Sequence, residues 1–224
     1  QANDLADQMP EKVAQLKNLF LVEATKNQAL PIGGGLWIPV FHPEMRLAPS
    51  QTEWVFPGDM TRIPEVTAPQ LGFRESVVTL DVDLPEQPSG VLYKLGANAG
   101  GLTLFIQDGV LIFEYNLFII QRTQVRSSST LPVGPATISV ITTPTEKAAA
   151  GPLQIVLEVN GEQVAEGVVP VSAPLFFTAN DCLDFGQALG SPVSLDYFKL
   201  APFAFNGTIH EAKVRYVETA EQSA

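Results

Sequence analysis

Histidine, the side chain that most often serves as a general base or metal ligand, occurs only twice in this chain. His42 lies in a proline-flanked stretch, whereas His210 lies in a predicted strand near the end of the sequence. A general base must be within hydrogen-bond reach of the proton it removes, so a shared site would require folding to bring these distant residues together. The sequence also contains no Gly-x-Ser-x-Gly elbow, no His-Glu-x-x-His pair and no Gly-x-x-x-x-Gly-Lys loop. We therefore assign no catalytic residue to this chain.

The only cysteine, Cys182, cannot form an internal disulfide or a multi-thiolate metal site. A nucleophilic cysteine needs a neighbouring cationic group that favours the thiolate. The residues on either side of Cys182 are Asp181 and Leu183, which provide no positive charge. We expect a buried or half-buried small apolar side chain instead.

Oxygen-bearing side chains gather in the last quarter of the chain. Asp181 and Asp184 could bind calcium at a sheet rim, but a turn in which Asn180 or Asp181 bonds the backbone is favoured. We therefore assign no metal ligand and keep calcium as the alternative cofactor. The stretch that follows offers hydroxyls, an acceptor and an aromatic ring to a sugar or aryl group, or else caps its own turns. The candidate binding loop comprises Asp181, Asp184, Ser191, Ser194, Asp196 and Tyr197.

The composition indicates a globular chain whose partners are neither nucleic acids nor membranes. Its 224 residues are 46% hydrophobic, which is enough for a sizeable core. The 13 Lys and Arg against 24 Asp and Glu give a formal charge of −11, which repels phosphate backbones and anionic lipids. The densest apolar stretch, 109–120, is interrupted by Glu114 and Asn116, so no run reaches the roughly 20 residues of a membrane span.

The first elements along the chain are a helix and an irregular connector. Leu5, Met9, Val13, Leu16 and Phe20 recur at steps of three and four residues, which predicts one helix near 10–26. An isolated helix of this length is marginal in water, so its apolar stripe must pack on something. Prolines and glycines then dominate, including the triplet at 33–35, which is typical of a hinge. We predict a helical arm over 1–29 and a connector over 30–74.

Strands dominate from residue 75 onward. Val78, Leu80, Val82 and Leu84 alternate with more polar residues, as in a strand with one wet face. The dipeptides Asp108-Gly109 and Asn160-Gly161 lie between alternating runs and suit tight hairpin turns. Eight or more strands without intervening helices predict a mainly β domain over 75–224, a two-sheet antiparallel sandwich of the jelly-roll, laminin-G or concanavalin A-like kind. The other predicted strands are 90–95, 102–107, 110–115, 117–125, 136–143, 153–159, 162–168, 174–178 and 208–217.

Three segments carry motifs that composition does not explain. Residues 3–13 read Asn-Asp-Leu-Ala-Asp-Gln-Met-Pro-Glu-Lys-Val, and residues 56–65 read Phe-Pro-Gly-Asp-Met-Thr-Arg-Ile-Pro-Glu. Residues 183–197 read Leu-Asp-Phe-Gly-Gln-Ala-Leu-Gly-Ser-Pro-Val-Ser-Leu-Asp-Tyr. In this order they resemble the carboxy-terminal region of bacterial arylsulfatases: the last core helix, the entry to a β-sandwich tail, and a segment near its end. The resemblance covers essentially the whole chain. It departs at 187–189, where the family commonly has Arg-Asp-Thr, which puts any ionic role of that loop in doubt.

The resemblance implies a tail without its catalytic head. Sulfatases cleave sulfate esters with a formylglycine made from a Cys/Ser-x-Pro-x-Arg motif, beside aspartates that hold a divalent cation. Neither is present, since the residues after Cys182 and Ser191 do not match that motif. The resemblance therefore implies a non-catalytic accessory domain of a bacterial sulfuric ester hydrolase, periplasmic or cytoplasmic. Its partner would be the sulfatase catalytic domain, which would supply the formylglycine and the cation.

Within such a tail, Arg62 and Glu65 are the predicted interdomain contacts, because an Arg–carboxylate pair fixes geometry as well as charge. The sandwich-rim loops could also shape the substrate mouth and meet a sulfated substrate or glycan. Two other functions stay open, a free-standing carbohydrate-binding module and a homo-oligomerisation module. For the first, only Trp37 and Trp54 are available as tryptophan readers, and both lie in the predicted connector, where anchoring to the core is their ordinary use.

Overall fold

The computed structural model describes residues 4–27, 29, 51–178 and 180–217. The chain divides into two compact units, Gln1–Gln51 and Thr52–Ala224, which are described separately below. The predicted hinge at 33–35 and the residues Trp37 and His42 lie outside the described residues. No helix among those described is both long and apolar enough to span a bilayer.

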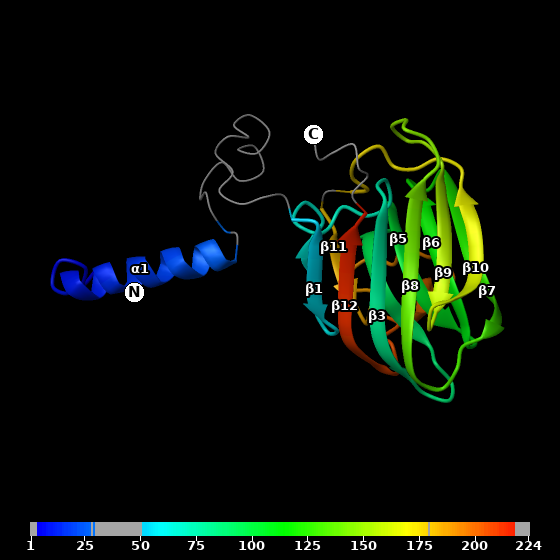
Figure 1. The fold of residues 1–224 in the computed structure, drawn as a ribbon, viewed down its shortest axis with the longest axis horizontal. Coiled ribbons are helices and arrows are strands. Elements are labelled where there is room, and N and C mark those ends of the chain that lie inside the picture. Colours follow the sequence, from blue (N-terminus) through cyan, green and yellow to red (C-terminus); the bar gives the residue numbers. More distant parts are fainter. Residues whose placement is uncertain (1–3, 28, 30–50, 179, 218–224) are drawn as a thin grey trace. The chain divides into compact units, whose positions relative to one another are not determined.

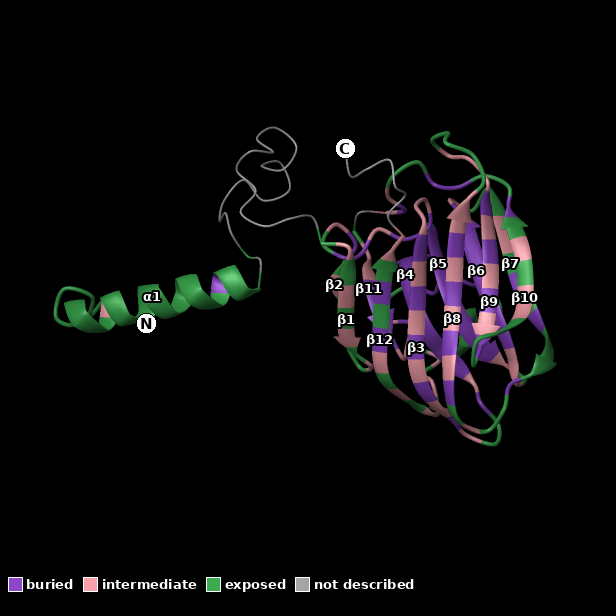
Figure 2. Cartoon of the chain, in the orientation of Figure 1, coloured by how far each residue is buried: buried purple, intermediate pink, exposed green. Residues whose placement is uncertain are grey.

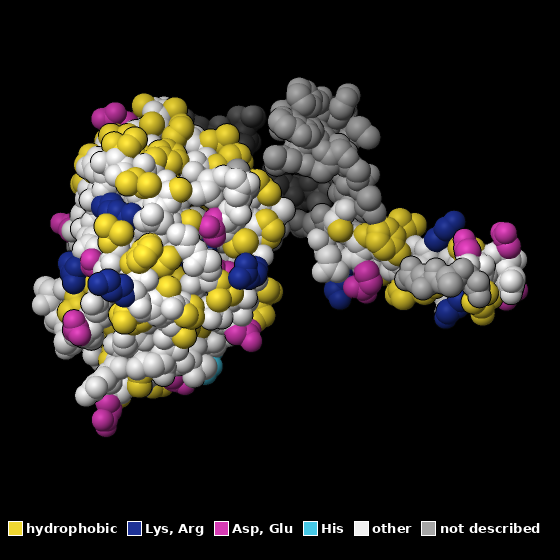
Figure 3. All heavy atoms as spheres, turned by 180° about the vertical axis from the view of Figure 1, so that it is seen from behind, with side chains coloured by type: hydrophobic (Ala, Val, Ile, Leu, Met, Phe, Trp, Pro, Cys, Tyr) yellow, Lys and Arg dark blue, Asp and Glu magenta, His cyan; other side chains and the backbone are white. Residues whose placement is uncertain are grey.

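Helix α1 (Pro10–Lys26) has the predicted bounds. Proline suits the first helical turn because its missing N–H would have no intrahelical partner there, and Lys26 in the last turn complements the helix dipole. At the end, the side-chain amide of Asn27 donates to the Glu23 carbonyl at 2.8 Å. Ala24 is the one buried residue of the helix. Hydrophobic side chains lie open along it (Figure 3), among them Met9, Leu16 and Phe20 with 50%, 51% and 50% exposure.

The second unit is a sandwich of two antiparallel sheets (Figure 1). Sheet A has the order β1 (Glu53–Pro57), β12 (Thr208–Tyr216), β3 (Ser76–Leu84), β8 (Gly134–Pro144), β9 (Leu153–Val159), β10 (Glu162–Val169). Sheet B has the order β2 (Ile63–Pro64), β11 (Cys182–Phe185), β4 (Gly90–Ala97), β5 (Gly100–Gln107), β6 (Val110–Leu117), β7 (Gln121–Thr130). The predicted fold class, mainly β with two sheets and one helix, is confirmed. The predicted hairpins are present too, with positive φ at Asp108, Gly109, Asn160 and Gly161.

The sandwich begins earlier than the predicted residue 75. Strand β1 pairs with β12, and β2 pairs with β11, although both come from the predicted connector. These strands are too short to show a period of two in the sequence. Trp54 and Phe56 pack against the core between the sheets, and the rings of Trp54 and Tyr216 lie 4.8 Å apart. Trp54 therefore serves as an anchor within the sandwich.

One strand prediction is wrong, and another is correct only for its second half, 121–125, which belongs to β7. Residues 117–125 contain a turn, in which the Ile120 N–H donates to the Leu117 carbonyl at 2.8 Å and Phe118 and Ile119 have φ of 50° and 67°. Apolar residues seldom adopt this backbone, so the sequence did not indicate a turn. Here the Asn116 side-chain oxygen accepts from the Ile119 N–H at 2.9 Å, and the Phe118 ring contacts Phe177. Residues 174–178 form no strand, since the backbone there bonds a carboxylate described below.

The two sheets differ in how their outer faces are covered. Along β3, β8 and β9 buried and half-buried residues alternate (Figure 2), as expected for a strand with one wet face. Strands β4 and β5 are buried at nearly every position. The reason is the segment 186–205, which we call the cover segment and which includes the short 3-10 helix η3 (Phe198–Leu200). Its residues Ala188, Tyr197 and Phe203 form a second apolar cluster with Val91, Phe105 and Ile112 on the outer face of sheet B.

Candidate functional site

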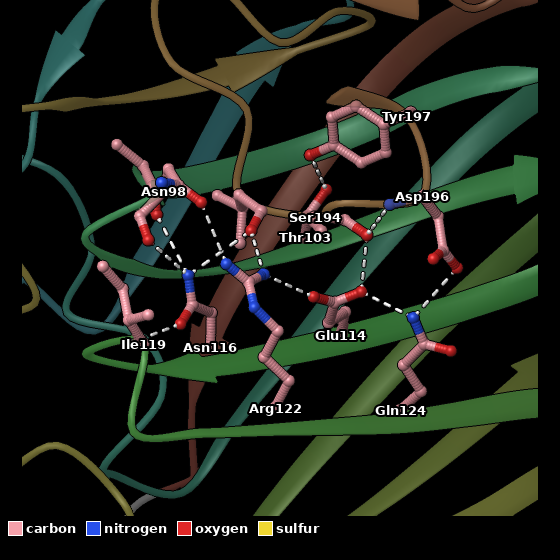
Figure 4. Close-up of polar contacts among 12 residues, drawn as sticks. Asn98, Thr103, Glu114, Asn116, Ile119, Arg122, Gln124, Ser194, Asp196 and Tyr197 are labelled. Atoms are coloured by element: carbon pink, nitrogen blue, oxygen red, sulfur yellow. Dashed lines mark hydrogen bonds and ion pairs between the residues drawn. The ribbon is translucent and has the colours of Figure 1, made fainter. Parts of the chain in front are cut away.

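Polar side chains line the outer face of sheet B beneath the cover segment (Figure 4). Glu114 and Asn116 lie two residues apart on β6 and therefore point to the same face. Their cross-strand partners on β7 are Gln124 and Arg122, respectively. The antiparallel register thus brings the two polar side chains of the mainly apolar strand β6 next to two polar side chains of β7 on one face of the sheet.

Glu114 is the centre of this network. Its buried carboxylate accepts from Arg122 Nη1 at 2.8 Å, Gln124 Nε2 at 2.6 Å and Ser194 Oγ at 2.5 Å. A buried carboxylate is costly unless it is paired and hydrogen-bonded, and here Arg122 balances its charge. Since Ser194 belongs to the cover segment, the same carboxylate holds that segment on the sheet.

Asn116 and Arg122 connect the turns at this end of the sandwich. The Asn116 side-chain nitrogen donates to the Asn98 carbonyl at 2.8 Å and the Val193 carbonyl at 3.4 Å. Arg122 donates to the Val193 carbonyl at 2.6 Å and to Asn98 Oδ1 at 2.9 Å. The network therefore joins the β4–β5 turn, the β6–β7 hairpin and the cover segment.

Tyr197 is fully buried and does not form the aromatic platform considered from the sequence. Its hydroxyl donates to Thr103 Oγ1 at 3.1 Å, and its ring lies 5.0 Å from Phe105 and 5.6 Å from Phe203. Burial raises the pKa of Tyr197 to about 12. The ring fills the space between the cover segment and the sheet, so it anchors the segment.

The accessible part of the site is a rim beside the buried network. Ser191 and Asp196 of the cover segment are exposed, while Ser194 is buried. Asp196 Oδ2 lies 3.0 Å from Gln124 Nε2 and 3.6 Å from Arg126 Nη1, and Arg126 also donates to Gln124 Oε1 at 2.8 Å. We call Gln124, Arg126, Ser191 and Asp196 the exposed rim. Of the predicted loop, Ser191 and Asp196 therefore face solvent.

The other two predicted loop residues, Asp181 and Asp184, hold a lysine. Lys94 on β4 is fully buried, and its Nζ lies 2.7 Å from Asp181 Oδ1 and 3.2 Å from Asp184 Oδ2. Asp184 also accepts from the N–H groups of Arg62 at 2.6 Å and Leu189 at 3.2 Å. The ammonium group thus lies where the calcium interpretation would place a cation. In the described part of the chain, no group of three or more His, Cys, Asp or Glu residues is suited to hold a metal ion.

The predicted interdomain pair, Arg62 and Glu65, makes contacts within the sandwich. Glu65 is buried, and its carboxylate accepts from the Phe177 N–H at 2.6 Å and the Thr178 N–H at 3.0 Å. The Arg62 side chain is exposed, while its backbone N–H bonds Asp184. Glu65 therefore positions the 177–178 loop, and an interdomain role stays a prediction that only Arg62 could fulfil with an open side chain.

Neither Cys182 nor His210 has a hydrogen bond or ion pair to this network. Cys182 is half-buried, and desolvation together with the nearby Asp184 carboxylate raises the pKa of its thiol. His210 lies on sheet A, where it pairs with Asp83. Every buried side-chain nitrogen and oxygen among the described residues has a hydrogen-bond partner. The arrangement is therefore suited to holding a rigid surface rather than to moving protons.

The sequence indicated the residues that the cover segment contributes to the network, but not their partners on the strands. Lys94, Arg122 and Gln124 gave no signal, because single polar residues in strands are common on solvated faces. Glu114 and Asn116 did interrupt the most apolar stretch of the chain, and that interruption was the available sign of a buried polar cluster. The bond between Ser194 and Glu114 joins residues that are 80 positions apart in sequence.

Comparison with known proteins gives likenesses of fold. No protein-family model and no curated protein matches the sequence. The chain is similar to domains LG4-5 of the mouse laminin alpha1 chain, with 15% identity and a TM-score of 0.48, over 77% of this chain and 44% of that one. It is also similar to galectin LEC-6 of Caenorhabditis elegans, with 12% identity and a TM-score of 0.43, over 75% of this chain and 99% of that one. A pentraxin of Limulus polyphemus is similar with 13% identity and a TM-score of 0.43, over 79% of this chain and 82% of that one. The chain thus spans less than half of the laminin chain that it matches, and these similarities concern the sandwich fold.

Proposed function

We propose that this chain is a non-catalytic accessory domain of an arylsulfatase-type sulfuric ester hydrolase, and that helix α1 packs on the catalytic domain. One observation supports this proposal most directly. Two segments that carry the arylsulfatase resemblance, 56–65 and 183–197, are far apart in sequence but adjacent in the fold. The two segments with the arylsulfatase resemblance thus meet at the same edge of sheet B, where β2 pairs with β11.

The contacts between these segments are specific. Strand β2 pairs with β11, with Ile63 opposite Leu183. The Arg62 N–H donates to Asp184 Oδ1 at 2.6 Å, and the Phe185 N–H donates to the Met60 carbonyl at 3.0 Å. Together these bonds close one edge of sheet B, which would otherwise present unpaired backbone groups. The motifs therefore have a structural task in a sandwich tail, and a catalytic role is not needed to explain them.

Helix α1 supports a docking role for the first unit. Met9, Leu16 and Phe20 are spaced along one face, and each is about half exposed. Burying the remaining apolar surface of such a side chain contributes about 1 kcal/mol. A 17-residue helix gains little stability on its own, so contact with another apolar surface would stabilise it. In this proposal that surface belongs to the catalytic domain, which also supplies the formylglycine and the divalent cation.

The exposed rim is the surface through which the sandwich would contribute to the substrate mouth. Arg126 and Asp196 carry opposite charges, and both side chains remain open to solvent although they lie 3.6 Å apart. The buried network beneath them keeps the cover segment in place. A rigid rim of this kind can orient a substrate without taking part in the chemistry.

The test is reconstitution with a bacterial arylsulfatase catalytic domain produced without its own carboxy-terminal tail. The chain alone should not hydrolyse p-nitrophenyl sulfate in the presence of divalent metal. Mixed with the catalytic domain, it should form a 1:1 complex by light scattering after size-exclusion chromatography. The variant Phe20→Ser should weaken this complex about fivefold, because it removes roughly 1 kcal/mol of apolar burial.

Gln15→Ser is the matched control, since it changes an exposed polar residue of the same helix. It should leave the complex unchanged. Turnover by the chain alone would overturn the proposal, as would the absence of a complex under conditions in which the catalytic domain is folded. A homodimer that Phe20→Ser dissociates would instead support the oligomerisation module.

A further inference from the structure

The outer face of sheet A carries a shallow groove that the accessory role does not use. Its volume is about 390 Å³, and it lies between β12, β3, β8 and the β9–β10 turn. Sites for small ligands measure about 300–1,000 Å³, so this groove can hold a ligand of the size of one or two sugar rings. The lining side chains that matter here are Asp81, Asp83, Pro135, Thr137, Asn160 and His210.

A β-bulge in β12 places the histidine at this groove. Ile209 lies opposite Val82 and Glu211 lies opposite Asp81, so His210 is the extra residue of the bulge. Its Nε2 lies 2.8 Å from Asp83 Oδ2. Bulges of this kind re-aim one side chain of a strand without disturbing the rest of the ladder. The fold therefore brings an imidazole and a carboxylate together at an accessible position.

The groove also offers hydrogen-bonding atoms that the protein itself leaves open. Asp81 Oδ1 accepts from Thr137 Oγ1 at 3.0 Å, and Asn160 Oδ1 accepts from the Thr137 N–H at 2.9 Å. The other polar atoms of these groups, Asp81 Oδ2, Asp83 Oδ1 and Asn160 Nδ2, have no hydrogen bond to any residue that the structure describes. Two acceptors and one donor are thus held in fixed positions by bonds to their neighbouring atoms.

Charge and shape select among ligands. Asp81 and Asp83 carry two negative charges, His210 is the one residue of the lining that can become positive, and the chain as a whole carries −11. Sulfate or carboxylate groups are repelled from such a groove. The exposed ring of Pro135 adds an apolar surface next to the polar atoms. Hydroxyl groups that donate to the two carboxylates, on a ring with an apolar face, match this combination.

We infer that the groove binds a neutral, hydroxyl-rich ligand, namely an unsulfated sugar residue. The two carboxylates accept hydroxyl protons, the Asn160 amide donates to a hydroxyl oxygen, and Pro135 contacts the C–H face of the ring. A shallow, open groove buries little of its ligand, so the Kd is on the order of millimolar. The inference does not depend on the accessory role, since the groove lies on the sheet opposite the cover segment.

The experiment follows the imidazole signals of the full chain by NMR. The chain has only two histidines, so the variant His42→Gln assigns the His210 signals directly. The probes are the methyl glycosides of glucose, galactose and mannose, with galactose 6-sulfate as the anionic counterpart, all at constant pH. At least one neutral glycoside should shift the His210 signals in a saturable way, while the His42 signals and the sulfated sugar show no change.

Matched variants separate the groove from the rest of the acidic surface. Asp81→Asn and Asp83→Asn keep the shape of the side chain and remove its charge, and each should raise the Kd about tenfold because a hydrogen bond to a charged group is lost. Asp108→Asn, at an exposed hairpin turn, is the control and should bind as the parent chain does.

Three results would overturn the inference. The first is that no neutral glycoside shifts the His210 signals at about 100 mM, which is about 100 times the expected Kd. The others are an equal shift with the sulfated sugar and equal Kd values for Asp83→Asn and Asp108→Asn. Each can be distinguished from a failure of the accessory role, since that role is tested by complex formation with the catalytic domain.

Discussion

The buried cluster around Lys94 allows a quantitative test of what closes the sandwich. The variant Lys94→Met replaces a fully buried ammonium group by an apolar chain of similar length. Two ionic contacts disappear, at 2.7 Å to Asp181 and at 3.2 Å to Asp184. Asp181 is 24% exposed, so water can solvate its carboxylate once Lys94 is gone, and the loss of this contact costs little. Asp184 is 1% exposed, so its carboxylate stays charged in the interior without its cation.

Breaking a buried ion pair by removing one partner costs about 3–5 kcal/mol. Asp184 still accepts two backbone N–H bonds, from Arg62 and Leu189, so we expect the lower end, a loss of about 3 kcal/mol in the free energy of unfolding. The double variant Lys94→Met/Asp184→Asn removes the orphaned charge as well. It should lose less than the sum of the two single variants, by about 1–3 kcal/mol.

The assay is urea-induced unfolding of the parent chain, the single variants and the double variant, followed by tryptophan fluorescence. Trp54 reports on the sandwich because it packs against the core on β1. Lys213→Met is the matched control, since Lys213 is an exposed lysine on β12 whose removal should not change the midpoint measurably. A loss of about 1 kcal/mol or less for Lys94→Met, the range of surface ion pairs, would refute the reasoning, and so would strict additivity in the double variant.

Three further predictions concern single positions. Gly58→Ala should lower the free energy of unfolding by about 1–3 kcal/mol, because an added Cβ would lie 1.8 Å from the Ile209 carbonyl oxygen. Gly161→Ala should lower it by about 1 kcal/mol, because its φ is positive although no atom lies close to the added Cβ. Urea unfolding midpoints of the two variants give the comparison. Tyr197→Phe should cost about 1 kcal/mol at neutral pH through the lost bond to Thr103. The folded pKa of Tyr197 is about 12 and its unfolded pKa about 10, so the contribution of this phenol is complete below pH 10 and is lost between pH 10 and 12. Two pKa units correspond to about 3 kcal/mol, so unfolding curves across this range should show the parent chain falling from above Tyr197→Phe to below it, and parallel curves would contradict the assignment. Ile119→Asn should stabilise the chain by about 1 kcal/mol, since asparagine tolerates the left-handed backbone at φ 67° and the isoleucine is 60% exposed; a lower melting temperature would show that its packing matters more.

The cover segment and the groove lie on opposite faces of the sandwich. On sheet B, Tyr197 and Glu114 hold the cover segment against the strands, while the exposed rim stays open to solvent beside the buried network. On sheet A, the outer face stays open and carries the groove around Asp83 and His210. The proposed accessory role and the proposed sugar binding can therefore be tested separately, by substitutions on opposite sheets.

The sequence alone determined the features that depend on local patterns. Apolar spacing at three and four residues placed helix α1 at its observed bounds, and alternation placed β3 with one wet face. Asp108-Gly109 and Asn160-Gly161 specified their hairpins, because these residues accept positive φ at little cost. Such features are local, since each is decided by residues that are neighbours along the chain.

The tertiary structure decided the features that depend on distant partners. It placed Tyr197 in the interior rather than at the surface, joined Asp181 and Asp184 through Lys94, and made a turn of Phe118 and Ile119 against their local preference. Each outcome depends on contacts between segments tens of residues apart, such as the bond of Glu114 to Ser194. A buried polar side chain and an exposed one look alike in the sequence, because burial is determined by which segment folds over it.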